Sequence, residues 1–236
     1  MKNVLLQATG LVKRYGSRCV VNGIDLEVRE KEVVAVIGPN GAGKSTTLDL
    51  ILGLKRKDAG NITYWREDYK AQVGVQLQTA PFFPKLSALD NLKLFAALRK
   101  RKLSVEEGVQ ILERCGLREV VQTEAARLSG GQQKRLAIAL ALVHHPKLVF
   151  LDEPTAALDP RARREIRELI RRLADDGASV VFTSHDMEEV GKLADRIVLI
   201  RDGRVVAEGT PEDLLHRHEV ENLEELYLKL TGEADA

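Results

Sequence analysis

The sequence predicts an α/β protein with a parallel-sheet core and an inserted helical segment. Short runs of β-branched and aliphatic residues, at 33–37, 148–151 and 179–183, are typical of strands buried on both faces. A charged stretch with helical periodicity, at about 160–175, separates the last two runs, and this alternation favours a parallel sheet. Between about 79 and 145 the pattern is helical.

The first strand leads into a glycine-rich loop. Residues 33–37 end at Gly38, and apolar residues then recur at helical spacing over about 43–54. The pattern predicts a strand, a glycine loop and a helix, in that order. Near the other end of the chain, two aliphatic runs flank Asp202-Gly203, a dipeptide that readily adopts the positive φ angles of a tight turn, so a late hairpin is expected.

The helical segment carries recognisable start and stop signals. Ser87 and Ser104 each stand three residues before an acidic residue, as in capping boxes. Gly116 and Pro146 are suited to end helices. We therefore expect one domain over 1–216, with a helical subdomain inserted at about 79–145, and a short C-terminal helical tail over 217–236.

The overall composition is that of an ordinary globular protein. Lys plus Arg number 36 and Asp plus Glu 35, so the chain lacks the basic excess typical of nucleic-acid binding. The two cysteines, Cys19 and Cys115, have no CxxC spacing, which favours a reducing, cytosolic compartment. Because no run of about 20 apolar residues occurs, we expect a chain that is soluble by itself.

The glycine loop carries the strongest chemical signal. It fits the GxxxxGK[ST] pattern and lies between a predicted strand and a predicted helix, as that pattern requires. Glycines let backbone N–H groups surround phosphate oxygens, Lys44 supplies charge to the β- and γ-phosphates, and the Ser45 hydroxyl suits Mg²⁺. The predicted nucleotide-binding residues are Gly38, Pro39, Asn40, Gly41, Ala42, Gly43, Lys44, Ser45 and Thr46.

Two carboxylates follow the predicted strand at 148–151. Asp152 suits the magnesium shell, directly or through water, and Glu153 is a candidate to orient or deprotonate the attacking water. Taken alone, the pair is equally typical of a helix cap, but beside a phosphate loop the catalytic interpretation is favoured.

A second glycine pair precedes another predicted helix. In isolation such a segment is usually only a cap or a turn. Here it is a candidate second anion site at a helix N-terminus. Its residues are Ser129, Gly130, Gly131 and Gln132.

Five motifs in one order resemble the ATP-binding cassette (ABC) family. They lie at 38–46, 128–132, 148–153, 157–159 and 184–186, so the resemblance covers nearly the whole chain. It implies a P-loop NTPase parallel-sheet core with an N-terminal antiparallel β subdomain and an inserted α-helical subdomain. It also implies an ATPase that uses ATP and Mg²⁺.

The resemblance assigns roles to further residues. It implies that Tyr15 stacks on adenine, that His185 contacts the γ-phosphate, and that Asp159 lies in a loop that crosses a head-to-tail dimer. Gln78 resembles the glutamine that joins the magnesium shell, with Gln76 as a rival for that place. Without the resemblance, the tyrosine and the histidine would more often be structural.

Partners follow from the same resemblance. Two chains would dimerise so that the segment at 129–132 of one reaches the ATP of the other; complete sites favour a homodimer, and a heterodimer is also compatible. The segment at 76–94 lies where membrane permease subunits dock, and its Phe82 and Phe83 suit docking and loop packing equally. The segment at 222–232 resembles that of bacterial ABC-2-type exporters.

We therefore expect the ATP-hydrolysing subunit of an exporter, peripheral on the cytoplasmic face of the cell membrane. The alternative is a soluble ABC ATPase that acts on a protein assembly, such as iron–sulfur cluster assembly. A non-catalytic nucleotide sensor is disfavoured, because Glu153 and His185 are both present. The segment from 60 to 78 is shorter than in many family members and lacks their glycine-marked turn, so a trimmed edge sheet is expected.

Overall fold

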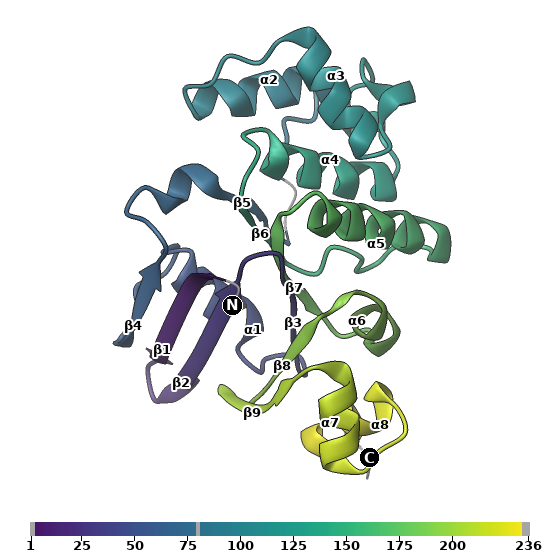
Figure 1. The fold of residues 1–236 in the computed structure, drawn as a ribbon. Helices are drawn as coiled ribbons and strands as arrows, with labels where there is room; N and C mark the ends of the chain where they lie inside the picture. Colours follow the sequence, from purple (N-terminus) through teal and green to yellow (C-terminus); the bar gives the residue numbers. More distant parts are fainter. Residues whose placement is uncertain (1–2, 79–80, 233–236) are drawn as a thin grey trace. The chain divides into compact units, whose positions relative to one another are not determined.

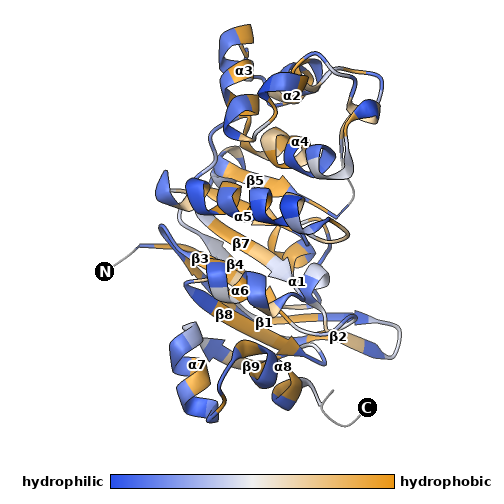
Figure 2. Ribbon diagram, turned by 90° about the vertical axis from the view of Figure 1, so that its right-hand side faces the viewer, coloured by the Kyte–Doolittle hydropathy of each residue, from blue (hydrophilic) through white to orange (hydrophobic). Residues whose placement is uncertain are grey.

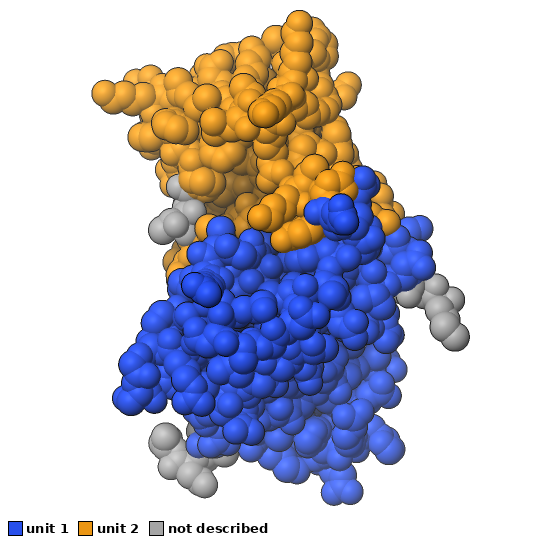
Figure 3. Space-filling view, turned by 90° about the vertical axis from the view of Figure 1, so that its left-hand side faces the viewer, with its two compact units in different colours: residues 1–67, 181–236 blue, residues 68–180 orange. Residues whose placement is uncertain are grey.

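A computed structural model describes residues 3–78 and 81–232 of the protein. The chain divides into two compact units, one formed by Met1–Glu67 with Val181–Ala236 and the other by Asp68–Val180 (Figure 3). No helix among the described residues is long and apolar enough to cross a membrane.

The first unit contains an antiparallel sheet of three strands (Figure 1). The strand β1 (Val4–Tyr15) lies between β2 (Arg18–Arg29) and β4 (Ala59–Tyr64) and is antiparallel to both. This confirms the expected N-terminal antiparallel sheet. After β4 the described chain does not return to this sheet; it enters a short 3-10 helix, η1 (Tyr69–Gln72), in the second unit.

The same unit contains part of the parallel core. The strand β3 (Val33–Ile37) is buried along its whole length and runs parallel to β8 (Arg196–Arg201), which forms an antiparallel hairpin with β9 (Arg204–Gly209). Asp202 and Gly203 turn the hairpin with φ angles of 50° and 73°, as the sequence predicts. The helices here are α1 (Lys44–Ile51) and α6 (Met187–Leu193).

Two capped helices complete the C-terminal part of this unit. Thr210 caps α7 (Pro211–His218) and Asn222 caps α8 (Leu223–Thr231). The helix α7 contacts β9, and α8 contacts α6 and α7. Residue 217, where we expect the tail to begin, lies inside α7, because Thr210 and a proline start that helix earlier.

The second unit combines helices with two parallel strands, β5 (Val73–Gln76) and β6 (Leu148–Leu151). Its helices α2 (Ala88–Leu98), α3 (Val105–Arg114) and α4 (Gly130–Leu142) pack against one another, which confirms the inserted helical segment. The helix α5 (Pro160–Asp175) is mainly hydrophilic with a narrow apolar face (Figure 2). Two short 3-10 helices, η2 (Arg118–Val120) and η3 (Ala125–Arg127), lie between α3 and α4.

Local signals in the helical segment act as predicted. The hydroxyls of Ser87 and Ser104 accept hydrogen bonds from backbone N–H groups three residues later, at 3.1 Å in both cases. Gly116 adopts a φ of 69° directly after α3 and its cap. Both cysteines are free: Cys115 is fully buried, which raises the pKa of its thiol to about 12, and Cys19 on β2 is half-buried.

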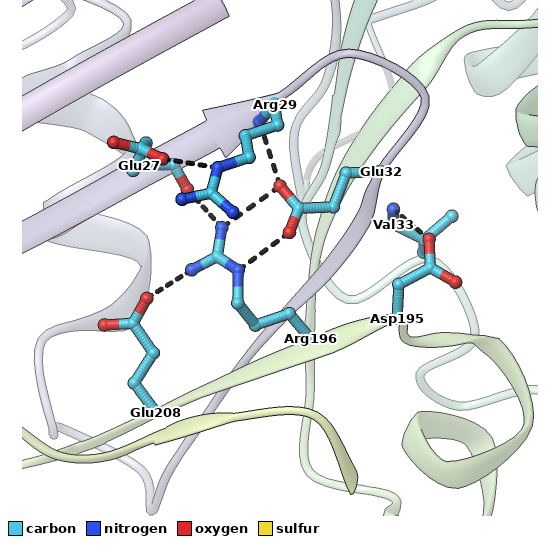
Figure 4. Close-up of polar contacts among 7 residues, drawn as sticks. All are labelled: Glu27, Arg29, Glu32, Val33, Asp195, Arg196 and Glu208. Atoms are coloured by element: carbon cyan, nitrogen blue, oxygen red, sulfur yellow. Dashed lines mark hydrogen bonds and ion pairs between the residues drawn. The ribbon is translucent and has the colours of Figure 1, made fainter. Parts of the chain in front are cut away.

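A network of charged groups joins β2, β8 and β9 in the first unit (Figure 4). Arg196 donates to both carboxylate oxygens of Glu32, at 2.7 and 3.1 Å, and also pairs with Glu208. The backbone N–H of Arg29 donates to Glu32 at 2.9 Å. Burial opposes ionisation of Glu32, but the bonds from Arg196 and Arg29 outweigh it and lower the pKa of this carboxyl group.

Candidate active site

The phosphate-type loop lies in the first unit, between β3 and α1. Gly38, Gly41 and Gly43 have φ angles of 147°, 80° and 106°, which other residues rarely adopt. A Cβ atom at Gly38 would lie 2.0 Å from the carbonyl oxygen of Ile200, and one at Gly43 would lie 2.5 Å from that of Val20. Glycine is therefore required twice over, by conformation and by space.

The loop is held by the turn of the late hairpin. Gly203 donates its backbone N–H to the carbonyl of Ala42 at 3.0 Å, and its own carbonyl accepts from Asn22 at 2.8 Å. A Cβ atom at Gly203 would lie 2.6 Å from the Val20 carbonyl oxygen. The sequence predicts this hairpin but not its supporting role, because the loop and the turn lie far apart along the chain.

Lys44 and the N-terminus of α1 concentrate positive charge at the loop. The Lys44 side chain is buried, and its ammonium donates to the carbonyls of Gly38 at 2.6 Å and Pro39 at 3.1 Å. Thr47 bonds back to the Gly43 carbonyl at 2.8 Å. Glycine N–H groups, the helix N-terminus and a fixed ammonium together form a cradle suited to phosphate oxygens.

Tyr15 lies at the end of β1, in the same unit. Its side chain is exposed, which leaves the ring accessible for stacking, and the Lys13 ammonium lies over the ring at 5.4 Å from its centroid. The guanidinium of Arg18 lies 3.6 Å from the position of a Cβ atom on Gly41. Sequence reasoning missed Arg18, because no motif marks a residue that meets the loop from a neighbouring strand.

His185 joins the strand β7 (Ser179–Ser184) to α6, also in the first unit. The residue is exposed, whereas Ser184 before it is buried. Asp186 caps α6 through a bond from the Glu189 backbone N–H to its carboxylate at 3.0 Å.

The paired carboxylates lie in the second unit, at the carboxyl end of β6. Asp152 is buried, and its backbone N–H donates to the carbonyl of Gln76 on β5 at 2.9 Å. Glu153 is half-buried and has a positive φ of 46°. Lys134, on α4, donates to the Glu153 carbonyl at 3.2 Å. Burial lowers the pKa of Lys134, and the nearby Glu153 and Asp152 carboxylates oppose that shift.

The two rival glutamines occupy different environments. Gln76 is buried at the end of β5, and its amide donates to the backbone carbonyls of Leu77 at 2.5 Å and Asp152 at 3.4 Å. Gln78 is exposed in the bend that follows β5. The exposed amide of Gln78 is available to a ligand, whereas the amide nitrogen of Gln76 is bound to backbone carbonyls and its buried Oε1 has no hydrogen-bond partner among the described residues.

The second glycine motif and Asp159 share one cleft in the second unit. Ser129 and Gln132 form a reciprocal capping box at the start of α4, and the Asp159 carboxylate caps α5 at 3.0 Å. The cleft has a volume of about 400 Å³. Its walls include Ser129, Gly130, Gly131, Gln132, Arg135, Leu158, Asp159 and Arg161. The N-terminus of α4 opens into this cleft beside Arg135 and Arg161, which suits an anion, while Asp159 and Glu165 place carboxylates in the same wall.

Comparison with known proteins identifies the family. Residues 21–156 match the model of the family described as ABC transporter. The chain belongs to this family. Its members' ATP-binding subunits hydrolyse ATP, so the chain is an ABC transporter ATPase subunit.

Curated relatives of this ABC subunit include proteins named for resistance, export and import. The linearmycin resistance ATP-binding protein LnrL of Bacillus subtilis is 38% identical over 90% of this chain and 71% of its own length. The Nod factor export ATP-binding protein I of Burkholderia orbicola is 38% identical over 86% of this chain and 70% of its own length. The spermidine/putrescine import ATP-binding protein PotA of Mesoplasma florum is 36% identical over 94% of this chain and 66% of its own length.

Solved structures share the fold of the ABC subunit. The ADP conformation of the ATP-binding cassette MJ1267 matches with a TM-score of 0.83 at 25% identity and covers 96% of this chain and 99% of that one. The dimeric, post-hydrolysis state of the cassette MJ0796, bound to ADP and Pi, matches with a TM-score of 0.78 at 28% identity. The match covers 87% of this chain and 98% of that one. The predicted α/β cassette fold is thereby confirmed.

The two units of the ABC subunit carry different parts of the predicted site. The first unit holds Tyr15, the phosphate loop and His185. The second holds Gln78, the carboxylate pair, the second glycine motif and Asp159.

Proposed function

We propose that two copies of this ABC ATPase close head to tail around two molecules of ATP and that hydrolysis reopens them. The observation that carries the proposal is the open cleft that Ser129, Gly130 and Gly131 at the start of α4 line together with Asp159. Lys44 would bind the ATP of its own chain, and this cleft would meet the ATP of the other copy. The MJ0796 structure, a dimeric post-hydrolysis state bound to ADP and Pi, supports the formation of a dimer.

The residue roles in this proposal follow from their chemistry. Ser45, Gln78 and Asp152 offer the hydroxyl, amide and carboxylate oxygens that Mg²⁺ prefers, so these residues fit the ion. When bound, Mg²⁺ would neutralise charge on the phosphate oxygens. Glu153 would take a proton from the attacking water, and His185 would donate a hydrogen bond to the γ-phosphate.

We propose that this closing and reopening of the dimer moves separate membrane permease subunits, and that these subunits export the substrate. Phe83 is exposed and Phe82 is half-buried in the segment proposed for docking, which supports a protein contact there. Relatives named for export and resistance support the direction, while a relative named for import marks the alternative. A peripheral place on the cytoplasmic face of the membrane follows from such partners.

Glu153→Gln tests the catalytic assignment. The variant removes the base but preserves shape, so it should bind ATP with near-normal affinity, lose at least about 100-fold in kcat, and accumulate as an ATP-bound dimer. Steady-state ATPase assays and size-exclusion chromatography with ATP measure these effects. Glu168→Gln, on the exposed face of α5, is the matched control. Turnover within threefold of the parent would reject Glu153 as the base.

Co-purification tests the transport assignment. The tagged chain is recovered in mild detergent from membranes of its native host, and its partners are identified by mass spectrometry. A multi-spanning protein in near-equal amount supports a transporter, whereas recovery with soluble proteins alone would favour the soluble ABC ATPase instead.

A further inference from the structure

Three hydrogen bonds form a closed ring around His185 in the first unit. The Ser184 hydroxyl donates to the Glu189 carboxylate at 2.6 Å and accepts from the Asp186 backbone N–H at 3.1 Å. The Glu189 backbone N–H donates to the Asp186 carboxylate at 3.0 Å. His185 is the single residue between β7 and the cap of α6, and both of its chain neighbours are therefore tied to Glu189.

The burial of Glu189 needs an explanation. Its side chain is 1% exposed, and Ser184 is 4% exposed. Burying a carboxylate is costly unless hydrogen bonds and charge compensate it. The N-terminus of α6 supplies part of that compensation, because Glu189 lies in the first helical turn. Its neighbour Glu188 lies in the same turn and is exposed. A carboxylate can therefore interact with this helix end without being buried, so the helix end does not explain why Glu189 is buried.

We propose that Glu189 is a positioning residue that fixes the direction of His185 through Ser184 and Asp186. The ring sets the backbone on both sides of the histidine, so it determines where the exposed imidazole points. The inference rests on the proposed role of His185 at the γ-phosphate. A displacement of about 1 Å at a catalytic group is enough to reduce a rate about 100-fold.

Substitutions within the ring give the first test. Glu189→Ala should lower kcat about 10- to 100-fold with the KM for ATP within twofold, because ATP binding does not depend on the histidine's direction. Glu189→Gln retains an oxygen that accepts from Ser184 and should stay within about threefold of the parent. Glu188→Ala, in the same turn, is the matched control. Thermal unfolding of each variant separates loss of fold from loss of rate.

A double-mutant cycle with His185→Ala distinguishes positioning from general support of the fold. If Glu189 acts through His185, then Glu189→Ala should change kcat less than twofold when the histidine is already absent. Ser184→Ala, which keeps the carboxylate but removes its hydroxyl donor, should give the same pattern and replaces Glu189→Ala if that variant fails to fold.

The outcomes separate the two hypotheses. The positioning role would be overturned if Glu189→Ala lowered kcat by the same factor with and without His185→Ala, or if Glu189→Ala alone left kcat unchanged. Either result would leave the proposed role of His185 standing. An unchanged kcat in His185→Ala would instead overturn the proposed role of the histidine, and the positioning role with it.

Discussion

Glu153 combines a proposed catalytic side chain with an unusual backbone conformation. Its φ of 46° lies in the left-handed region, which few residues other than glycine, asparagine and aspartate adopt. Such conformations persist where the surrounding structure holds them, and they recur at active sites. Lys134 supplies one such contact, because its ammonium donates to the Glu153 carbonyl. We infer that Lys134 helps to fix the direction of the carboxylate.

Removal of the Lys134 amine should therefore slow hydrolysis more than it weakens nucleotide binding. For Lys134→Ala we expect a kcat about 5- to 20-fold lower, with the KM for ATP within twofold, in steady-state ATPase assays. Lys134→Gln retains an N–H donor and should recover most of the rate. A Lys134→Ala kcat within twofold of the parent would show that the contact is dispensable.

Individual site residues differ in how far the sequence predicts them. The phosphate loop is predictable because its glycines and lysine stand together in one pattern. The sequence does not distinguish Gln76 from Gln78 as the magnesium ligand. The two glutamines are only two residues apart, and no sequence signal shows that the strand ends between them. Only the burial of Gln76 against its neighbours' carbonyls distinguishes them.

Among the elements, the hairpin of β8 and β9 is predicted as a turn, but its support of the phosphate loop is not. The dipeptide Asp202-Gly203 predicts the turn through local backbone preference alone. That Gly203 also supports the phosphate loop depends on a contact between distant parts of the chain, which local preference does not encode. Strands buried on both faces, such as β3 and β6, match their predicted bounds, because continuous apolar runs end sharply at polar or glycine residues.

Gly203→Ala should weaken ATP binding by moving the loop away from its support. An added Cβ atom would meet the Val20 carbonyl, so we expect a Kd for a fluorescent ATP analogue at least about fivefold higher. Gly53→Ala is the matched control, because Gly53 has a similar φ of 70° and no atom within 4 Å of its Cβ position. Both variants carry the same backbone strain. An equal Kd in the two variants would contradict the supporting role.

At the scale of the whole molecule, the division into two units is invisible in the sequence. One of the two boundaries, between Val180 and Val181, falls inside the continuous strand β7 and inside an uninterrupted apolar run. Sequence signals such as glycine and proline mark turns and linkers, and none is present at this point. The predicted helical insertion therefore describes only part of the second unit, which also includes β5, β6 and α5.

The two units contain groups that respond to acid over different pH ranges. In the second unit, burial lowers the pKa of His144 to about 4, from an ordinary 6.5. The unfolded chain therefore takes up a proton first, and the stability due to neutral His144 is lost as the pH falls from about 6.5 towards 4. In the first unit, the lowered pKa of Glu32 gives stability that is present above its ordinary value of 4.5 and lost below it.

Acidification should therefore loosen the second unit first. Between pH 7 and pH 5, hydrogen exchange followed by mass spectrometry should show a loss of protection in β5 and α4, by about 1–2 kcal/mol after allowance for partial exposure of His144. The strands β3 and β8 should remain protected over this range. His144→Gln, which retains a donor for the Val73 carbonyl, should remove most of the difference. Simultaneous loss in both units would contradict this order.

The two cysteines of the chain should react very differently with thiol reagents. Alkylation requires the thiolate, and the buried Cys115 thiol, with its pKa of about 12, has almost none near neutral pH. Cys19 is half-buried and lies opposite Arg14 in the β1–β2 pairing, one residue along from Tyr15. A maleimide dye should therefore attach at one place in the native protein, beside the proposed adenine contact. The unmodified sequence thus provides its own site for a fluorescent reporter of nucleotide exchange.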